Sequence, residues 1–258
     1  MTSIIPIPAF ADNYIWTLRE SGHAVVVDPG DAAPVLEYLD REGLALTAIL
    51  ATHHHNDHVG GVPALVARYG VPVFGPARES IPERARGLGE GDEIEVPGLS
   101  LRMRVMDIPG HTAGHIAFFG DVSGTPSVFC GDTLFAAGCG RLFEGTPQQM
   151  WASLSALAAL PADTRVYCGH EYTLANIRFA LAVEPHNADL WDRQAREQAK
   201  RDRGEPTLPS TIGEERLTNP FLRASIPAVR QAAAIHAGAP VTGDVDSFAA
   251  LRAWKNAF

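Results

Sequence analysis

One segment constrains the fold and chemistry of this chain more than any other, because it gathers five candidate metal ligands in six consecutive residues. These ligands are His53, His54, His55, Asp57 and His58. His53 and His55 are two apart, so on an extended segment their imidazoles point the same way. Neutral imidazole and carboxylate suit zinc, iron or manganese better than calcium or magnesium. A tag or an accidental histidine run would lack the aspartate and the apolar, strand-like residues 46–51 before it, so the segment predicts a metal centre.

The bulk composition is typical of a globular protein and excludes several functions. The chain has 258 residues, of which 46% are hydrophobic and 20% charged, enough for one large domain or a medium one with an appendage. The net charge of -9 argues against a general nucleic-acid binder, which needs a basic surface. No apolar run approaches the roughly 18 residues of a membrane span. Residues 1–10 lack the basic residue of a signal peptide.

Cysteine usage indicates the compartment. Cys130, Cys139 and Cys168 are odd in number and far apart, so they form neither a disulfide framework nor a Cys-x-x-Cys zinc knuckle. We therefore expect a reducing, cytoplasmic setting, and the N-terminus shows no arginine-rich mitochondrial pattern. We also expect a monomer whose partner is a small molecule, with neither nucleic acid nor membrane.

The first two-thirds of the chain alternates strand-like and helical runs. The expected strands are short, rich in β-branched or aromatic residues and bounded by Gly, Pro or Asp. They are residues 4–7, 14–18, 24–27, 48–51, 71–74, 100–105, 116–119, 127–130 and 165–168. Helical spacing marks residues 34–42 and 62–69. A further helix is expected from Thr146 to about residue 160, because threonine, proline and glutamine stand where a capping box needs them.

After residue 170 the pattern changes to helices alone. The expected helices are residues 173–183, 188–203, 226–236 and 245–257, with a Pro- and Thr-rich connector over 204–219 and no strand. We infer an α+β chain in two parts. Residues 1–170 form a metal-binding catalytic domain, and residues 171–258 form a helical, substrate-binding domain.

Three more candidate ligands follow strands, where folds with mixed helices and strands gather reactive groups. His111 stands in a glycine-flanked turn, Asp132 lies just beyond residues 127–130, and His170 lies just beyond residues 165–168. The expected ligands are His53, His55 and His111 for one ion, Asp57, His58 and His170 for the other, and Asp132 as a bridge. Seven protein ligands leave positions open for water at both ions, which marks a catalytic site.

Neighbouring polar residues are expected to support these ligands without binding metal. His54 and His115 are assigned to packing or to hydrogen bonds behind the ligands. Asp28, in an Asp-Pro-Gly-Asp turn, is assigned to the turn itself or to capping near the site. The cysteines beside Gly131 and Gly169 are expected to act as small hydrophobic residues.

The motif His53-x-His55-x-Asp57-His58, with His111, Asp132 and His170 downstream, resembles the metallo-β-lactamase superfamily. This resemblance covers about residues 1–170. It implies a four-layer αββα sandwich with the metals at one edge, here followed by a helical domain.

Further motifs are similar to those of glyoxalase II, the hydroxyacylglutathione hydrolases. They are Asp12-Asn13-Tyr14-Ile15-Trp16, Gly131-Asp132-Thr133-Leu134-Phe135, Gly138-Cys139-Gly140-Arg141, Phe143-Glu144-Gly145-Thr146, Gly169-His170-Glu171-Tyr172-Thr173, Asn219-Pro220-Phe221-Leu222-Arg223 and the ending Leu251-Arg252-x-x-Lys255. This likeness covers essentially the whole chain. It implies hydrolysis of S-D-lactoylglutathione to D-lactate and glutathione, the second step of methylglyoxal detoxification.

The same resemblance implies five substrate contacts. Tyr172 matches the tyrosine after the last metal histidine, and Arg252 and Lys255 match the basic pair that holds the glycine carboxylate of glutathione. Arg141 and Phe143 stand where some members have lysine and tyrosine. Arginine keeps the charge but changes the donor geometry, whereas phenylalanine removes a hydroxyl. Independently of the family, Arg252 and Lys255 are three apart on a helix and therefore share a face.

The expected catalytic residues are Asp57 and Asp132. A hydroxide bridging two divalent metals attacks the thioester carbonyl, Asp57 orients it, and the metals stabilise the oxyanion. A thiol pKa of about 8.5 lets the thiolate leave without a strong general acid. Zinc is the first expectation for the metal. Iron and manganese stay open, because His and Asp ligands serve all three.

Four alternatives remain at this stage. A glutathione persulfide dioxygenase would use one iron and consume oxygen, but it lacks the long helical appendage ending in Arg-x-x-Lys. A β-lactamase or lactonase has no use for that basic pair. A nuclease of this fold needs a basic surface, which the charge of -9 disfavours. A metal-binding interaction protein without catalysis is opposed by the complete set of seven ligands.

Overall fold

Two six-stranded sheets form the centre of the computed structural model, which describes residues 1–258. The first sheet follows sequence order: β1 (Ser3–Ala9), β2 (Asn13–Glu20), β3 (His23–Val27), β4 (Ala45–Leu50), β5 (Val73–Pro76) and β6 (Arg84–Leu88). The second sheet runs in the order β14 (Ser210–Thr211), β13 (Arg165–Cys168), β10 (Thr125–Gly131), β9 (Ile116–Val122), β8 (Arg102–Asp107) and β7 (Glu93–Glu95). A small hairpin pairs β11 (Leu134–Phe135) with β12 (Gly138–Cys139).

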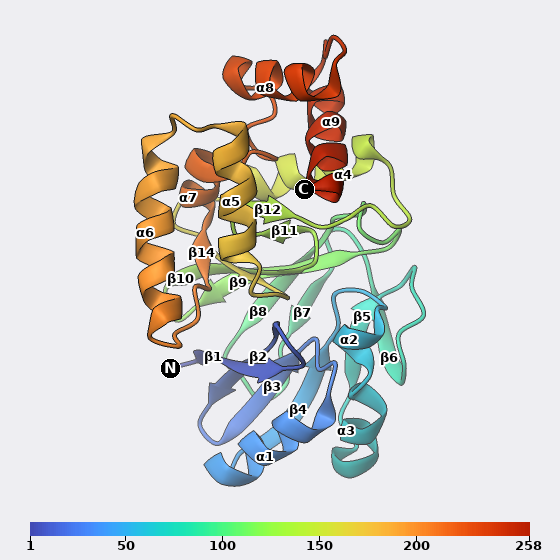
Figure 1. The fold of residues 1–258 in the computed structure, drawn as a ribbon. Coiled ribbons are helices and arrows are strands. Elements are labelled where there is room, and N and C mark those ends of the chain that lie inside the picture. The colour runs from blue at the N-terminus through green and yellow to red at the C-terminus, as the bar shows by residue number, and fades with distance from the viewer.

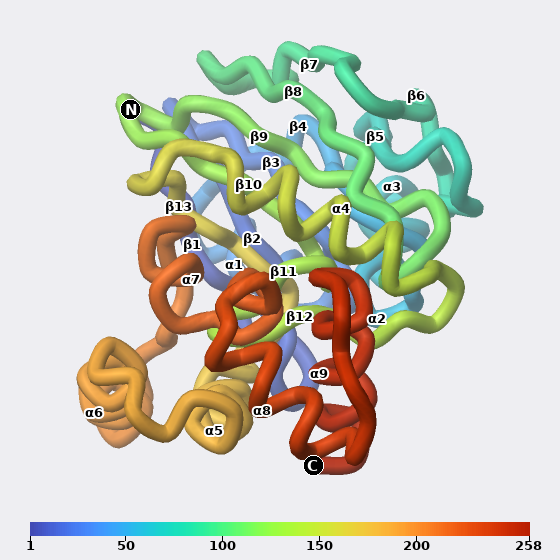
Figure 2. The backbone as a smooth tube through the Cα atoms, turned by 90° about the horizontal axis from the view of Figure 1, so that it is seen from above, coloured from blue at the N-terminus to red at the C-terminus, as the bar shows by residue number.

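Helices cover the outer faces of both sheets. The helices are α1 (Ala32–Glu42), α2 (Asn56–Val59), α3 (Val62–Tyr69), α4 (Pro147–Ala158), α5 (Thr173–Val183), α6 (Ala188–Asp202), α7 (Ile212–Thr218), α8 (Pro227–Ala237) and α9 (Asp244–Ala257). In Figure 1, α1 and α3 lie below the first sheet, and α4 lies with the C-terminal helices on the side of the second. Figure 2 shows the C-terminal helices gathered at one side of the molecule, opposite β6, β7 and β8.

Alternation along the strands explains the layers. In β2, Tyr14, Trp16 and Leu18 belong to the larger buried cluster, and Ile15, between Tyr14 and Trp16, belongs to the smaller one. Successive side chains of a strand point to opposite faces, so the first sheet buries one face against the second sheet and the other against α1 and α3. This arrangement confirms the expected α+β fold, a four-layer αββα sandwich with a C-terminal helical region.

Most expected elements are present, and three have the expected ends. The helices at residues 62–69 and 173–183 coincide with α3 and α5, and the strand at 165–168 coincides with β13. The capping box is confirmed, because the Thr146 side chain accepts from the amide of Gln149 and the Gln149 side chain binds the backbone of Thr146. The polar strand β6, the three-residue β7 and the short elements α2, β11 and β12 were not expected.

The expectation of a strandless connector over residues 204–219 is wrong. Ser210 and Thr211 form β14, which pairs with Arg165 and Val166 of β13. Helix α7 then begins at Ile212, where the Thr211 side chain accepts from the amide of Glu214. Prolines and threonines dominate this segment, and a strand of two residues has no sequence period that could reveal it.

The C-terminal helices share one core with the sheets. Phe179, Phe221, Phe248 and Leu251 belong to the same buried cluster as residues of β8, β9 and β10.

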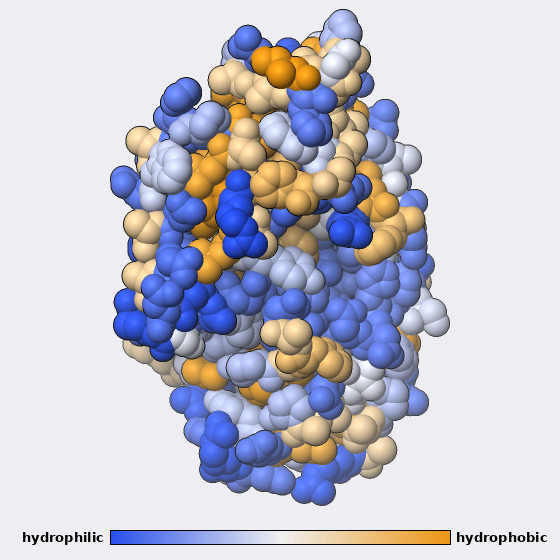
Figure 3. Space-filling model, viewed as in Figure 1, coloured by the Kyte–Doolittle hydropathy of each residue, from blue (hydrophilic) through white to orange (hydrophobic).

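No helix is long and apolar enough to cross a membrane. In the space-filling view the middle of this face is mostly hydrophilic, and apolar surface is more frequent above it, over the C-terminal helices (Figure 3).

Candidate metal centre

All seven expected ligands come together at one edge of the sandwich. Each follows a strand: His53, His55, Asp57 and His58 follow β4, His111 follows β8, Asp132 follows β10, and His170 follows β13. Because the ends of these strands meet at the same edge, segments far apart in sequence meet there as well.

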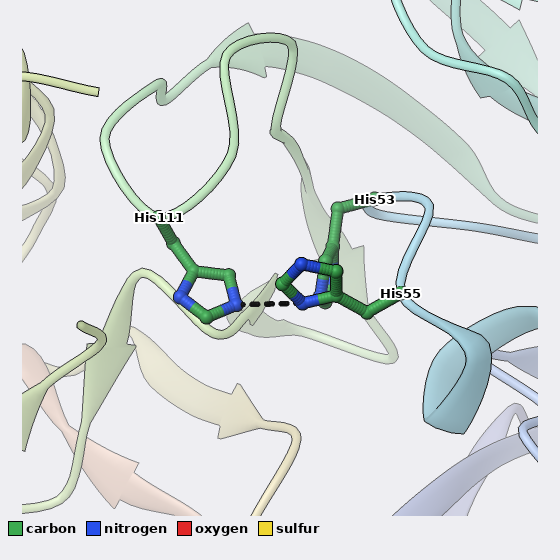
Figure 4. A group of neighbouring side chains, drawn as sticks. All are labelled: His53, His55 and His111. Atoms are coloured by element: carbon green, nitrogen blue, oxygen red, sulfur yellow. Dashed lines mark hydrogen bonds between the residues drawn. The ribbon is translucent and has the colours of Figure 1, made fainter. Parts of the chain in front are cut away.

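The first group contains three histidines. The ligand nitrogens of His53, His55 and His111 all lie within 4.8 Å of one another. Figure 4 shows the His111 ring reaching from its loop toward His55, with Nε2 of His111 3.0 Å from Nδ1 of His55. The rings converge on one point from two separate segments, as the ligands of one ion must.

The second group contains Asp57, His58 and His170, whose ligand atoms also lie within 4.8 Å of one another. Oδ2 of Asp57 lies 3.5 Å from Nε2 of His170 and 3.6 Å from Nε2 of His58. The side chain of Asp57 is 44% exposed, whereas that of His58 is 1% exposed. Asp57 is therefore the member of this group that most readily meets a molecule arriving from solvent.

Asp132 lies between the two groups. Its Oδ1 is 3.3 Å from Nε2 of His58, and its Oδ2 is 3.3 Å from Nε2 of His170 and 3.5 Å from Nε2 of His111. One carboxylate thus faces both groups, which is the position a bridging ligand needs. Gly169 makes this approach feasible, since a Cβ there would sit 2.6 Å from Cε1 of His58 and 2.7 Å from Oδ1 of Asp132.

Four of the histidines are oriented through the ring nitrogen that does not face the centre. Their Nδ1 atoms contact Thr52 Oγ1 (His53, 3.0 Å), Asp28 Oδ2 (His58, 3.1 Å), the Arg141 carbonyl (His111, 2.8 Å) and Asp12 Oδ1 (His170, 2.9 Å). Such outer contacts fix the ring orientation and the tautomer of metal-binding histidines.

Buried atoms without partners show that the residues fit metal ions. Nε2 of His53, Nε2 of His58 and Oδ1 of Asp132 are buried and make no hydrogen bond. The last two lie 3.3 Å apart, but without the angles of a hydrogen bond. Burying an unsatisfied polar atom costs about 1–3 kcal/mol, so three of them at one point need a shared explanation. Divalent cations held by these atoms would satisfy all three.

Asp28 stands directly behind the centre. It accepts from the amide and the hydroxyl of Thr52, each at 2.7 Å, and it contacts Nδ1 of His58 at 3.1 Å. Its oxygens lie near the nitrogens of His53 and His58 but are already engaged by these groups. The expected role in a turn near the site is therefore joined by a second one, because Asp28 orients a ligand.

The two remaining histidines of the region also lie behind the ligands, as expected. His115 stacks on His53 with ring centroids 4.5 Å apart, and its Nε2 accepts from the amide of Asp132 at 3.2 Å. His54 points away from the centre, and its Nδ1 lies 2.9 Å from Oε2 of Glu79.

The protonation states of His53 and Asp132 suit metal binding. Burial lowers the pKa of the His53 imidazole well below its usual range, which favours the neutral, ligating form. Burial alone would raise the pKa of Asp132. The nearby His58 and His170 outweigh it and hold that pKa well below the usual range, so Asp132 is a carboxylate.

A cavity of about 450 Å³ opens onto the metal centre and holds every expected substrate contact. It is lined by ligand residues together with Arg141, Phe143, Tyr172, Arg252 and Lys255. The Tyr172 ring stacks on His170 at 4.7 Å, and Phe143 packs edge-on to His111 at 5.3 Å. Nη1 of Arg252 donates to the Cys139 carbonyl at 2.8 Å. The cavity therefore brings the ligand cluster and several basic side chains together in one lining.

The cavity also has lining residues to which the sequence analysis assigned no role. Phe135 and Asn176 line it, and Cys139 lies beside Arg252. Behind it, Asp12 contacts His170, and Asn13 donates to Asp57 at 3.1 Å. The motif at residues 12–16 was a signal for the last two, but it could not show which ligands they serve.

Comparison with known proteins agrees with this geometry. The family model for the metallo-β-lactamase superfamily matches residues 11–170, and the model for the hydroxyacylglutathione hydrolase C-terminus matches residues 171–258. The chain is 59% identical to a hydroxyacylglutathione hydrolase of Alkalilimnicola ehrlichii over 99% of each chain. It is 54% identical to one of Cupriavidus metallidurans over 100% of each.

The chain belongs to the hydroxyacylglutathione hydrolase family. It is an enzyme of the metallo-β-lactamase fold, and the family's activity is thioester hydrolysis. Among solved structures, it is similar to TTHA1623 in a di-iron-bound form, with a TM-score of 0.60, 29% identity and coverage of 84% of this chain and 99% of that one.

Proposed function

We propose that this enzyme hydrolyses S-D-lactoylglutathione to D-lactate and glutathione, and so acts in methylglyoxal detoxification. The observation that carries the proposal is the lining of one cavity, which includes both the ligand cluster and the basic residues Arg252 and Lys255. A glutathione thioester needs both kinds of group, because it has a carbonyl to be attacked and a glycine carboxylate to be held.

Two divalent ions are proposed to bind as the sequence predicts, with His53, His55 and His111 on one, Asp57, His58 and His170 on the other, and Asp132 between them. When bound, such ions lower the pKa of a water toward neutrality and polarise the carbonyl under attack. We propose zinc first. Iron remains an alternative, and the di-iron form of TTHA1623 supports it; manganese fits the same donors.

Asp57 is proposed to orient the attacking water. Its side chain is partly exposed to the cavity, and Asn13 holds its Oδ2 in place at 3.1 Å. Asp132 is buried and stays ionised, so its role is to fix the two ligand groups relative to each other. The product thiolate needs no strong acid, because a thiol pKa of about 8.5 makes it a good leaving group.

The basic residues of the cavity are proposed to hold the glycine carboxylate. Burial, followed by the charges of Arg252, Arg178 and Arg141, lowers the pKa of Lys255. Several cations therefore lie near one another without an acidic partner among them, and a bound carboxylate would relieve their repulsion. Tyr172 and Phe143 are proposed to flank the peptide of the substrate.

We further infer a two-domain division at residues 170 and 171, a monomer, and a cytoplasmic setting. The free, buried state of all three cysteines supports a reducing compartment. The match of separate family models to residues 11–170 and 171–258 supports the division.

The deciding experiment measures S-D-lactoylglutathione hydrolysis by purified protein, with and without a strong chelator, alongside metal analysis. Rapid, chelator-sensitive turnover with nearly two metals per chain is the expected result. Full metal loading without turnover would contradict the proposed substrate. Oxygen uptake with glutathione persulfide would then identify the dioxygenase alternative.

A further inference from the structure

Glu79 is a buried carboxylate outside every motif that the sequence displays. It lies in the loop between β5 and β6, and its side chain is 3% exposed. Oε1 accepts from the amide of Gly114 at 2.9 Å and from the hydroxyl of Thr112, and Oε2 lies 2.9 Å from Nδ1 of His54. A buried carboxylate is costly unless hydrogen bonds satisfy it, so this set of partners accounts for its burial.

A second carboxylate, that of Glu144, also contacts both His54 and the turn at residues 112–114. Oε1 of Glu144 lies 3.3 Å from Nε2 of His54, and its Oε2 accepts from the amide of Ala113 at 2.8 Å. His54 therefore lies between two carboxylates, and each of them also binds the turn at residues 112–114. We call this set of contacts the Glu79–His54–Glu144 bridge.

The bridge joins the two segments that carry the first ligand group. His54 stands between His53 and His55 in the chain, and the turn at residues 112–114 directly follows His111. The same segments also meet where Nε2 of His111 lies 3.0 Å from Nδ1 of His55, and where the amide of Ile116 donates to the carbonyl of Thr52 at 3.0 Å. Asp57, His58 and His170 make no hydrogen bond or ion pair with Glu79 or Glu144.

Glu79 itself is held firmly. The Arg84 side chain donates to the carbonyls of both Pro76 and Glu79, which fixes the backbone of the loop. On the other side the fit is close, since a Cβ at Gly114 would sit 2.7 Å from Cγ of Glu79. The Glu79 carboxylate therefore has little freedom to move, and its hydrogen bonds hold the turn after His111 in a defined position.

We propose that Glu79 is a positioning residue that sets the spacing of His111 from the His53–His55 segment, and so the affinity of that group for its ion. A carboxylate offers about four acceptor positions, enough for Gly114, Thr112 and His54 together. Glutamine replaces one oxygen by an NH₂ donor, so Glu79→Gln keeps the shape but loses the negative charge and one of the two acceptor atoms.

The test measures zinc binding to the full chain by competition with a chelator. Nitrogen chemical shifts of the imidazoles assign each binding step to His53, His55 and His111 or to His58 and His170. We expect Glu79→Gln to weaken the first group about 10- to 100-fold, the range typical of residues behind metal ligands. The second group should change less than about 2-fold, because the bridge does not touch it.

Glu83→Gln is the matched control, since Glu83 is on the same loop, carries the same charge and is exposed. It should leave both affinities unchanged. Glu144→Gln removes the other arm of the bridge at a partly exposed site, so it should fold even if Glu79→Gln does not, and it should weaken the same group. Equal affinities in wild type, Glu79→Gln and Glu144→Gln would overturn the proposal, as would equal weakening of both groups.

The inference rests on the proposed two-ion centre but not on the proposed substrate. A wild-type chain that binds fewer than two ions would contradict the centre itself. A wild-type chain that binds two ions with no selective effect of Glu79→Gln contradicts only the role of Glu79. Inactivity toward S-D-lactoylglutathione affects neither result.

Discussion

Nδ2 of Asn13 donates to Oδ2 of Asp57 at 3.1 Å, across 44 positions of sequence. The same amide also reaches the Asp57 carbonyl at 3.3 Å. Asn13 begins β2, and the adjacent Tyr14 amide donates to the carbonyl of Gly169 at 2.8 Å, so the first sheet is tied here to the segment that carries His170. The position of Asp57 is therefore set by the contact between the two sheets.

We expect Asn13→Ala to lower kcat about 10- to 100-fold with a smaller change in KM. The hydrogen bond holds a charged group that is proposed to orient water, and bonds to charged groups contribute about 1.5–3 kcal/mol. Steady-state kinetics with S-D-lactoylglutathione, combined with metal analysis, checks this. Unchanged kcat at full metal loading would contradict the orienting role of Asp57.

Asp132→Ala should remove both metal occupancy and turnover. The Asp132 carboxylate lies close to His58 and His170 of one ligand group and to His111 of the other, so its loss affects both groups together. Asp163→Ala, at an exposed position far along the chain, is the control for handling and folding. The measurement is metal analysis after purification, together with turnover of the substrate. Normal activity in Asp132→Ala would contradict the two-ion model.

Lys255 should give the enzyme an alkaline limit on substrate affinity. Burial and then the charges of Arg252, Arg178 and Arg141 lower the pKa of Lys255. As the pH rises, the Lys255 side chain of the free enzyme therefore loses its charge at a lower pH than an ordinary lysine, whose pKa is about 10.4. The charged form is the one proposed to hold the carboxylate, so KM should be low below this lowered pKa and rise as the pH passes through it.

Lys255→Arg is the matched variant, because arginine stays charged throughout this range. The rise of KM with pH should disappear in it, while any effect of the substrate's own amino group persists in both proteins. Identical KM profiles for the two proteins would show that Lys255 does not hold the carboxylate.

Phe143→Tyr should strengthen substrate binding. The Phe143 side chain lines the cavity, its residue is 64% exposed, and its ring lies 5.6 Å from that of His55. A hydroxyl at this place can reach the peptide of glutathione, and a typical hydrogen bond of about 0.5–1.5 kcal/mol corresponds to a KM lower by about 2- to 12-fold. Phe10→Tyr, on an exposed turn outside this cavity, is the control. A KM that stays unchanged or rises in Phe143→Tyr would refute the contact.

The sequence predicts ligands well because their chemistry is local, and it predicts their support poorly because support is long-range. The residue type and spacing of His53 and His55 identify them as ligands, and the ends of the expected strands indicate His111 and Asp132. Glu79 gives no such signal, because its role depends on contacts with residues 25 to 35 positions away along the chain.

The same contrast holds for the fold. Helix α3 has a clear period and defined ends, so the sequence gives it correctly. Strand β14 exists only because β13 offers it a partner, and α7 begins at a cap within a proline-rich segment. Such elements depend on tertiary contacts rather than on local preference.

A buried ion pair in the C-terminal helices also supports the wall of the cavity beside the metal centre. Nη2 of Arg193 donates to Oε1 of Glu215 at 2.6 Å, and the two side chains are 2% and 0% exposed. Oε2 of Glu215 accepts from the amide of Ala137 at 2.8 Å and from Asn219 at 3.0 Å. Asn219 in turn donates to the carbonyl of Gly138 at 2.9 Å. The pair thus supports the β11–β12 hairpin, which carries two residues of the cavity wall.

We expect Arg193→Met to destabilise the metal-loaded enzyme by about 3–5 kcal/mol, because it leaves the Glu215 carboxylate buried without its charge partner. At about 2–4 °C per kcal/mol for a chain of this size, Tm should fall by about 6–20 °C. The matched control is Arg203→Met, since Arg203 and Glu205 also lie 2.6 Å apart but are exposed, and their loss should not move Tm. Equal shifts in the two variants would mean that burial of the Arg193–Glu215 pair adds nothing to its contribution.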